Sequence, residues 1–452
     1  MSLGLLGIIV ALVAFLFLVY QGFNQFYSAA LCALIVAFTN GLNPVAAFTE
    51  TYVGGLTETV TALFSIIFLG VILGKVFTDT GAASSIATTL TNKFVLGKEG
   101  RTQIRVTLFV LTIIEGLCTM GGIDGYVLVF TMFPVCLILS KTADIPRRFI
   151  PCMLVLNTAF MAAPGAPQIT NVMVQTALGM AGYHVAPTAA PIAGIVGGII
   201  MLVGGFIMLD ILIAKAKNKG EHFDMGEVPE LPQNKDSKLP NFFVSIIPLI
   251  VVFVCYTVIG WNIAVALALG IVVNLVLMSQ YISRETIRGP INGLTAIKNT
   301  LNMGANGYPN ALITVSTPAA LAAVIASTAA FGAVAEALGK VNINVYLLCF
   351  IVCAIIVTLT SSPPAAIMMS VPMVVAIATQ RGIDFDVNAI ARIAAFTSIT
   401  FESLPWNGTV IMTQGMSHTT HKQSYFPIFL QTVGFTTAAA VVAALLAMVG
   451  IV

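Results

Sequence analysis

The chain alternates long apolar stretches with short polar segments. Apolar stretches of about 18 residues or more recur along nearly its whole length, as helices that cross a hydrocarbon core of roughly 30 Å require. The pattern predicts matching sets of elements in the two halves of the chain. They are expected at residues 4–20, 27–45, 58–78, 104–140, 147–180 and 189–214, and again at 242–259, 262–280, 308–338, 345–378, 388–416 and 426–450.

Polar, glycine-rich or proline-rich breaks interrupt four of these elements. They are residues 121–125 (GGIDG), 163–167 (APGAP), 358–364 (TLTSSPP) and 403–408 (SLPWNG). A backbone group without a hydrogen bond in hydrocarbon costs several kcal/mol, so such breaks occur where they are buried in protein or line a cavity. We therefore predict that the four breaks converge on one water-accessible solute site, as in a transporter.

One polar segment and a count of crossings predict the domain organisation. Residues 215–241 form a linker between residues 1–214 and residues 242–452, which are of similar length. Each half is predicted to contain three spans, a re-entrant hairpin (104–140 or 345–378), a broken transmembrane helix (147–180 or 388–416) and a final span. Because a hairpin returns to its own side, each half crosses the membrane an odd number of times. The fold class is therefore an all-α polytopic membrane protein made of two inverted repeats.

Composition and charge agree with a membrane setting. Hydrophobic residues make up 58% of the chain, charged residues only 8%, and the mean hydropathy is +0.99, which excludes an ordinary soluble domain. The net charge of +2 is too small to indicate a nucleic-acid partner. On this topology all of the 20 Lys and Arg residues except Lys340, Arg381 and Arg392 fall on one face, which predicts a cytoplasmic linker and both termini outside a bacterial inner membrane.

Residue context also bears on the first apolar stretch and on the cysteines. The first apolar stretch has no Lys or Arg before it, so it is interpreted as a retained span and not as a signal peptide. The seven cysteines lie in apolar context without metal-ligand spacing, so they are predicted to be inert core residues, and no metal or other cofactor is expected.

The second hairpin is predicted to bind the substrate with hydroxyl groups and a helix start. Ser362 is placed as an N-cap with Pro363 at the first helical position, so the next half-helix would aim its amides at Thr360 and Ser361. The hydroxyls of Thr360, Ser361 and Ser362 would donate to a carboxylate or ligate a sodium ion. Alternatively, they only cap the helix.

The first hairpin contributes Gly122 and Asp124. Asp124 falls in the first turn of the second half-helix, where an acidic side chain is a routine complement to the helix dipole. At membrane depth a carboxylate is also a functional candidate, for substrate binding or for coupling. Glu115, one half-helix earlier, is a secondary candidate that packing or a helix partner can satisfy.

The broken helices add candidates for binding and for coupling. Residues with suitable polar groups or ring surfaces are Gln168 and Asn171 in the first half and Ser403, Trp406 and Asn407 in the second. Glu402 is the preferred coupling residue, because a carboxylate in a partly desolvated pocket can exchange protons near neutral pH. The alternatives are a buried salt bridge between Glu402 and Arg392, an Arg392 that binds the substrate carboxylate instead, and a Trp406 that only packs.

These motifs together resemble the gluconate permease (gluconate:proton symporter) family of the ion transporter superfamily, and within it a 3-hydroxybutyrate permease-like branch. The resemblance covers nearly the full length. The segments that carry it are Phe68-Leu69-Gly70 through Lys75, Asp79 to Ala83, Gly121-Gly122, Asp144 to Arg148, Pro164 to Ile169, Leu404 to Gly408 and His421 to Tyr425. The resemblance implies secondary transport of small organic acids by a homodimer, with an elevator-like movement of the hairpins and broken helices.

The chain also departs from the family pattern. Gluconate-type members place a histidine in the segment that matches Ala163 to Pro167, and none is present here. The resulting apolar turn favours a short substrate with one carboxylate and few hydroxyls. We therefore predict a proton-coupled symporter of a short hydroxy- or oxo-carboxylate. A sodium-coupled carboxylate symporter is the alternative, a channel is less favoured, and no Ser/His/Asp constellation indicates an enzyme.

Overall fold

The computed structural model describes residues 3–21, 23–123, 125–226, 238–286, 289–340, 343–360, 362–405 and 407–452. These residues are mostly helical. The first half contains α1 (Leu3–Tyr20), α2 (Gln25–Thr39), α3 (Pro44–Ala46), α4 (Val53–Asp79), α5 (Ala82–Leu90), α6 (Gly100–Met120), α7 (Gly125–Thr142), α8 (Ile150–Met153), α9 (Thr158–Met161), α10 (Ile169–Met180) and α11 (Pro191–Asn218). The second contains α12 (Phe242–Phe253), α13 (Ile263–Met278), α14 (Gly293–Ala326), α15 (Ala329–Lys340), α16 (Val345–Thr360), α17 (Pro363–Gln380), α18 (Val387–Ser398), α19 (Gly408–Met416), α20 (His421–Phe429) and α21 (Phe435–Met448).

Short elements extend or join these helices. β1 (Glu285–Thr286) pairs antiparallel with β2 (Gly289–Pro290). The π-helical segments are η1 (Ala47–Tyr52), η2 (Thr91–Val95), η4 (Val254–Val258) and η6 (Leu430–Gly434), and the 3-10 turns are η3 (Arg147–Phe149) and η5 (Ser279–Tyr281).

Asparagine side chains begin many of the helices. Their amide oxygens accept hydrogen bonds from the N–H groups of the first turn, which have no partner within the helix. These N-caps are Asn24 of α2, Asn43 of α3, Asn241 of α12, Asn262 of α13 and Asn292 of α14. A neutral amide satisfies such donors without adding a charge to a segment that enters the bilayer.

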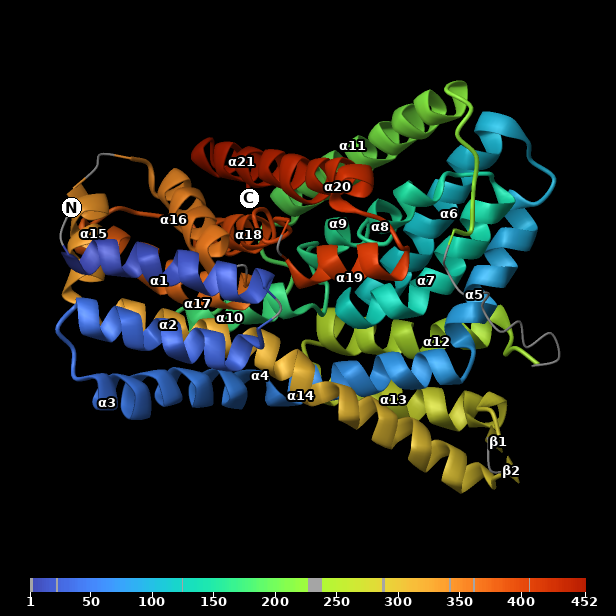
Figure 1. The fold of residues 1–452 in the computed structure, drawn as a ribbon, viewed down its shortest axis with the longest axis horizontal. Coiled ribbons are helices and arrows are strands. Elements are labelled where there is room, and N and C mark those ends of the chain that lie inside the picture. Colours follow the sequence, from blue (N-terminus) through green and yellow to red (C-terminus); the bar gives the residue numbers. More distant parts are fainter. Residues whose placement is uncertain are drawn as a thin grey trace.

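Six helices pack each against the next in a row, in the order α1, α2, α14, α4, α13 and α12, and they lie in the middle and lower parts of Figure 1. The centre of the row is the long contact between α4 and α14, where small residues let the two backbones approach. A Cβ atom on Gly55 would lie 2.6 Å from the Cβ of Ala323, and a Cβ on Gly304 would lie 3.0 Å from the Cα of Ile72. Side chains at either glycine would push the row apart.

The remaining helices pack on this row and mix the two halves of the chain. Helices α16 and α17 pack against each other, and α10 of the first half packs on both α17 and α18 of the second. Likewise α11 packs along α21, at the top of Figure 1. Most buried hydrophobic residues of α10, α17, α18 and α21 belong to one cluster, which therefore joins the two halves of the chain.

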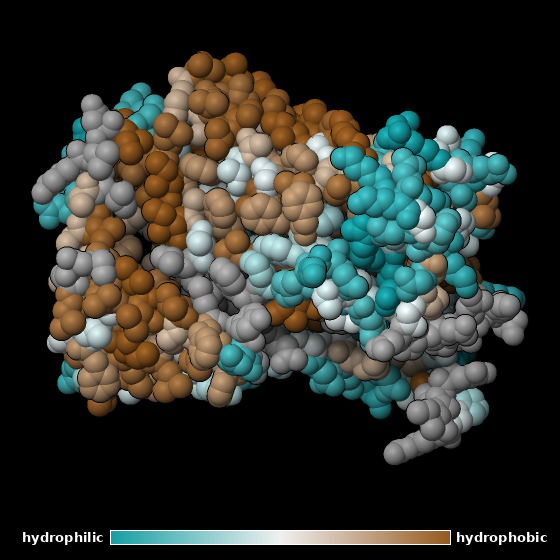
Figure 2. Space-filling view, turned by 45° about the horizontal axis from the view of Figure 1, so that its top comes forward, coloured by the Kyte–Doolittle hydropathy of each residue, from teal (hydrophilic) through white to brown (hydrophobic). Residues whose placement is uncertain are grey.

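The surface fits a membrane protein. Five of the described helices are long and apolar enough to cross a membrane, namely Gly100–Met120, Pro191–Asn218, Ile263–Tyr281, Pro363–Gln380 and His421–Met448. On α11, exposed hydrophobic residues recur at helical spacing at Ile192, Ile195, Ile199, Val203, Ile207 and Ile211, as expected for a face that contacts lipid. Figure 2 shows hydrophobic residues over the left and upper parts of the molecule and hydrophilic residues gathered at its right end, which carries α5, β1 and β2 in Figure 1.

One predicted element differs from the structure. The span expected at 308–338 begins earlier, at Gly293, and α14 ends at Ala326 before α15 starts at Ala329. Its polar first part is helical because Asn292 caps it and α4 packs along it. The break follows from Thr328, whose hydroxyl accepts a hydrogen bond from the N–H of Phe331 and so begins a new helix. The start and the end of α14 are therefore determined by tertiary packing and local caps, and not by the hydrophobicity of the sequence.

The start of the polar linker is fixed to the loop after α7. Asp144 accepts hydrogen bonds from Lys217, from His222 and from the main-chain N–H of Phe223. Arg148 forms a salt bridge with Glu221, and Arg147 forms one with Asp224. Burial alone would raise the pKa of Asp144, but its three donors together lower that pKa well below its usual range. The Asp144 to Arg148 motif thus holds residues 217–224, and linker residues 227–237 lie outside the described part of the chain.

Candidate functional site

The first interruption is a tight turn between α6 and α7. Gly122 has φ +83°, a left-handed conformation that favours glycine. Its N–H donates to the carbonyl of Thr119, and the N–H of Ile123 donates to the carbonyl of Cys118. These bonds satisfy the last carbonyls of α6, so the chain can reverse direction between two buried helices. Asp124, the next residue, lies outside the described residues.

Residues from all four interruptions line one cavity. Gly122 comes from the first, Pro167 from the second with Gln168 directly after it, Ser362 from the third, and Ser403 from the fourth with Glu402 directly before it. The space open to the centres of water-sized molecules is about 100 Å³, several times the roughly 10–15 Å³ that one water needs. The other lining residues are Ile66, Ile67, Gly70, Val71, Gly125, Val129, Val155, Asn157, Thr158, Met161, Ile169, Thr170, Leu267, Pro363, Pro364 and Thr409. The interruptions therefore converge, as predicted.

Gln168 joins the first two interruptions. Its Nε2 donates to the carbonyl of Thr119 at 2.6 Å and to that of Ile123 at 3.1 Å, so the broken segment is fixed to the turn after α6. Its Oε1 is buried and has no hydrogen-bond partner among the described residues. Gln168 also precedes α10, which begins without a side-chain cap. The positive end of the α10 dipole therefore lies at the cavity wall, next to Ile169 and Thr170.

The helix start in the second hairpin is capped as predicted but offers fewer amides than expected. Ser362 is the N-cap of α17 and accepts from the N–H of Ala365 at 3.4 Å. The first two helical residues, Pro363 and Pro364, have no N–H, and the N–H of Ala366 donates to the carbonyl of Ser362. The expectation that α17 aims several free amides at the site is therefore corrected. Its contribution is the helix dipole and the Ser362 side chain.

Arg392 supports the second interruption from behind. Its side chain is only 2% exposed, and it donates to the carbonyl of Ala189 through Nε at 3.1 Å and Nη2 at 2.7 Å. Its Nη1 donates to the carbonyl of Ala162 and to Oδ1 of Asn171. Neither proposed alternative for Arg392 holds within the described part of the chain, since it forms no ion pair with Glu402 and does not line the cavity.

Asn171 and Asn407 also have structural partners. The Asn171 amide donates to the carbonyls of Ala163 and Ala166 at 2.9 and 3.0 Å and accepts from Arg392, so it closes the turn before α10. Asn407 caps α19 by accepting from the N–H groups of Thr409 and Val410. Both lie next to cavity-lining residues without lining the cavity themselves. The side-chain amides of Asn171 and Asn407 therefore position the residues that line the cavity.

The fourth interruption is held by α20. His421 donates through Nε2 to the carbonyl of Pro405 at 2.6 Å, and the Tyr425 hydroxyl donates to the carbonyl of Ser403 at 3.2 Å. These bonds fix the residues on both sides of Leu404. Glu402, which is partly buried and lines the cavity, precedes them directly. The segments Leu404 to Gly408 and His421 to Tyr425 are therefore one structural unit.

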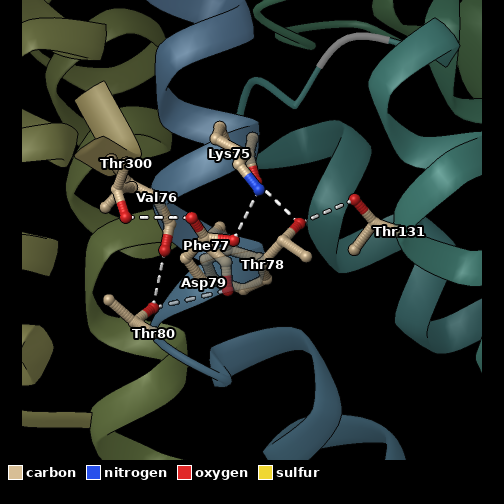
Figure 3. Close-up of polar contacts among 9 residues, drawn as sticks. Lys75, Val76, Phe77, Thr78, Asp79, Thr80, Thr131 and Thr300 are labelled. Atoms are coloured by element: carbon tan, nitrogen blue, oxygen red, sulfur yellow. Dashed lines mark hydrogen bonds and ion pairs between the residues drawn. The ribbon is translucent and has the colours of Figure 1, made fainter. Parts of the chain in front are cut away.

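A polar cluster at the end of α4 ties three helices together near the cavity wall (Figure 3). The Lys75 ammonium pairs with Asp79 at 2.7 Å, and the other Asp79 oxygen accepts from Thr300 of α14 at 2.9 Å. The hydroxyls of Thr78 and Thr131 lie 3.0 Å apart and join α4 to α7. Because α4 lines the cavity one turn earlier, this cluster positions a wall instead of contacting a solute.

The predicted site residues thus fall into three groups. Gly122, Gln168, Ser362, Glu402 and Ser403 line the cavity, and Asn171 and Asn407 support it. Ser361, Asp124 and Trp406 lie outside the described residues, as does the side chain of Thr360. Sequence reasoning missed Thr158 and Thr170, which line the cavity beside the second interruption, and Leu267 of α13. No local sequence signal marks Leu267, because its place depends on which helix packs against the breaks.

Comparison with known proteins identifies the family. The sequence model of the GntP family permeases matches residues 3–449. The chain belongs to the GntP permease family. It is similar to an uncharacterized transporter, YxjC, of Bacillus subtilis, with 24% identity over 99% of this chain and 100% of that one.

Two further relatives and one solved structure are similar to this chain. A Gnt-II system L-idonate transporter of Escherichia coli is 29% identical over 36% of each chain, and a gluconate permease of Bacillus licheniformis is 27% identical over 54% of this chain and 51% of that one. The YdaH transporter of Alcanivorax borkumensis has a similar fold, with a TM-score of 0.54 at 14% identity, covering 90% of this chain and 88% of that chain. This GntP-family chain is a multi-pass membrane transporter and not an enzyme.

Proposed function

We propose that this permease is a proton-coupled symporter that imports a short hydroxy- or oxo-carboxylate of the 3-hydroxybutyrate or gluconate type across the bacterial inner membrane. The observation that carries the proposal is the single cavity on which all four helix interruptions converge. The names of two relatives, an L-idonate transporter and a gluconate permease, support an organic acid as the transported class.

Both polar and apolar residues line the cavity, which suits a short organic acid. The substrate carboxylate would lie at the uncapped start of α10 and near the Ser362 hydroxyl, where helix dipoles favour an anion. A substrate hydroxyl would donate to the buried Oε1 of Gln168. The carbon chain would contact apolar residues such as Val71 and Leu267. Thr360, Ser361 and Trp406 remain proposed contacts, and Asp124 remains a proposed contact and an alternative coupling residue.

Glu402 is the proposed coupling residue, because it lines the cavity, where its carboxylate would meet both the substrate and water. Glu402→Gln is expected to abolish uptake driven by a pH gradient while leaving substrate counterflow exchange measurable, since an amide cannot release a proton. Uptake of radiolabelled 3-hydroxybutyrate and gluconate into proteoliposomes measures both. Full proton-driven accumulation by the variant would remove Glu402 from this role.

The coupling ion is tested on the unmodified protein. Proteoliposomes are given either an inward pH gradient or an inward sodium gradient at equal pH. Proton symport predicts accumulation only with the pH gradient. Accumulation with the sodium gradient alone would establish the sodium-coupled alternative, and solute efflux without counterflow exchange would indicate a channel.

The proposed architecture is a homodimer of inverted repeats that works by an elevator movement, with a cytoplasmic linker and both termini outside. The gathering of hydrophilic residues at one end of the molecule supports the orientation (Figure 2). All seven native cysteines are buried, so a cysteine placed at exposed Lys219 can be labelled selectively. We expect an impermeant maleimide to label Lys219→Cys in inside-out vesicles but not in intact cells, and Asp384→Cys in the opposite pattern. The reverse result would invert the topology.

A further inference from the structure

Glu115 lies in the second half of α6 and is completely buried. Neither of its carboxylate oxygens has a hydrogen-bond partner among the described residues. The main-chain N–H of Asn157 is the polar group that approaches the carboxylate. The packing or helix partner that the sequence suggested for Glu115 is therefore not found in the described part of the structure.

Two more unpartnered polar atoms are buried near this part of α6. The hydroxyl of Thr119, one turn later on α6, is buried without a partner, and so is Oε1 of Gln168. Gln168 is held against this turn by its bond to the Thr119 carbonyl. Both Gln168 and Asn157 line the cavity. Asn157 and Gln168 thus connect the surroundings of Glu115 with the cavity, and the hydroxyl and amide groups there can relay a proton through water.

Among the described residues, no cation pairs with Glu115. The described titratable groups that face it are the thiols of Cys118 on α6, Cys136 on α7 and Cys152 on α8, which lie in the same apolar cluster. The charged residues on α6 and on the elements that pack against it are Arg101, Arg105, Lys93 of η2, Lys141 of α7, and Asp210, Lys215 and Lys217 of α11. They lie toward the start of α6, where Arg101 and Arg105 bind Asp210. Arg105 is ten residues from Glu115, roughly 15 Å along the helix.

Burial without a counter-charge has a clear consequence for the charge state. Moving an ionised carboxylate into such surroundings costs several kcal/mol even after relaxation, so the side chain holds a proton in this conformation. A buried, reversibly protonated carboxyl group near a solute cavity is what a proton-coupled carrier needs.

We propose that Glu115 is a proton-binding site of the transport cycle, an inference that rests on the function proposed above. It retains the coupling proton while the substrate anion occupies the cavity, and it releases the proton when water reaches it past Asn157 and Gln168. Glu402 faces the cavity directly and exchanges protons with its water. A proton on Glu115 favours a nearby anion, and by linkage the anion favours the proton.

Glu115→Gln tests this role, because the amide mimics the protonated carboxyl group and fits the same space. The variant should bind substrate without needing a proton. We expect at least a tenfold loss in steady-state accumulation under a pH gradient, while counterflow exchange stays within about twofold of the unmodified protein. The stabilisation of the detergent-solubilised protein by 10 mM gluconate or 3-hydroxybutyrate should also lose its dependence on pH between about 5.5 and 8.5. Glu99→Gln, the same change at an exposed position just before α6, should alter none of these quantities.

The outcomes separate the inference from the proposed function. Failure of the unmodified protein to accumulate either acid under a pH gradient would overturn the proposed proton symport. Normal accumulation by Glu115→Gln, or a pH profile of substrate stabilisation equal to that of the unmodified protein, would overturn the role of Glu115 and leave the symport intact. The role of Glu115 would also be overturned if substrate stabilised the unmodified protein equally at every pH. Thr107→Val removes another unpartnered hydroxyl buried on α6 and shows whether any loss reflects only changed packing of that helix.

Discussion

Arg392→Met is expected to lower the free energy of unfolding by about 2–6 kcal/mol, because it leaves the buried carbonyls of Ala162 and Ala189 without donors, at roughly 1–3 kcal/mol each. Methionine fills much of the space of the arginine stem but donates no hydrogen bond. The turn before α10 would lose its brace, and Asn171 would lose the donor to its Oδ1. Thermal unfolding of the purified protein in detergent measures the loss, and substrate uptake should fall with it.

Two variants show whether the hydrogen bonds carry this effect. Arg284→Met makes the same change at an exposed arginine and should leave the unfolding temperature within a degree or two. Arg392→Lys keeps the charge but lacks the planar fork, so it should fall between the methionine variant and the unmodified protein. Equal stability of Arg392→Met and Arg284→Met would mean that the carbonyls find other donors.

Gly122→Ala is expected to reduce substrate uptake roughly tenfold or more, because small displacements of a positioned group have large effects on rate. The residue has φ +83°, where a side chain costs about 1–2 kcal/mol. Its Cβ would also lie 2.9 Å from Cδ2 of Leu267 and 3.1 Å from Cγ1 of Val252. The turn after α6 would shift and take with it the carbonyls that hold Gln168. Initial uptake rates in proteoliposomes, normalised to reconstituted protein, give the effect.

Gly125→Ala is the matched control for this prediction. It lies three residues later and also lines the cavity. Its added Cβ would make only ordinary contacts, at 3.4 Å from Nδ2 of Asn157 and 3.6 Å from Met161, and its backbone conformation has no positive φ. Uptake should stay close to that of the unmodified protein. A loss as large as that of Gly122→Ala would show that the cavity volume, not the turn, limits transport.

Local chemistry made several features predictable from the sequence. Long apolar stretches predict helices because backbone groups in hydrocarbon must bond within their own segment. Prolines and glycines mark the interruptions for the same reason, as Pro164, Pro167 and Gly122 illustrate. The N-cap role of Ser362 followed from its place before Pro363 and is confirmed. These features depend only on neighbours in the chain, so they need no knowledge of the packing.

The roles of other residues depended on partners far along the chain. By side-chain chemistry alone, Asn171 and Arg392 could bind a substrate as well as Gln168 could. In the structure they hold the turn before α10 instead. Glu115 ranked as secondary by sequence, yet the packing buries it with no hydrogen-bond partner for either carboxylate oxygen among the described residues. The hydrogen-bonding capacity of such groups is the same in every context, and only geometry decides whether a carbonyl, a helix end or a solute uses it.

The sequence by itself therefore determined the helical membrane class, the positions of the breaks and the family, because each is encoded by residues close together in the chain. Only the tertiary structure decided that α4 and α13 line the cavity. It also decided which polar side chains line the cavity and which ones hold the lining segments in place. The physical reason is that a break exposes polar groups wherever it occurs, whereas the identity of the group that satisfies them depends on which helices pack against it.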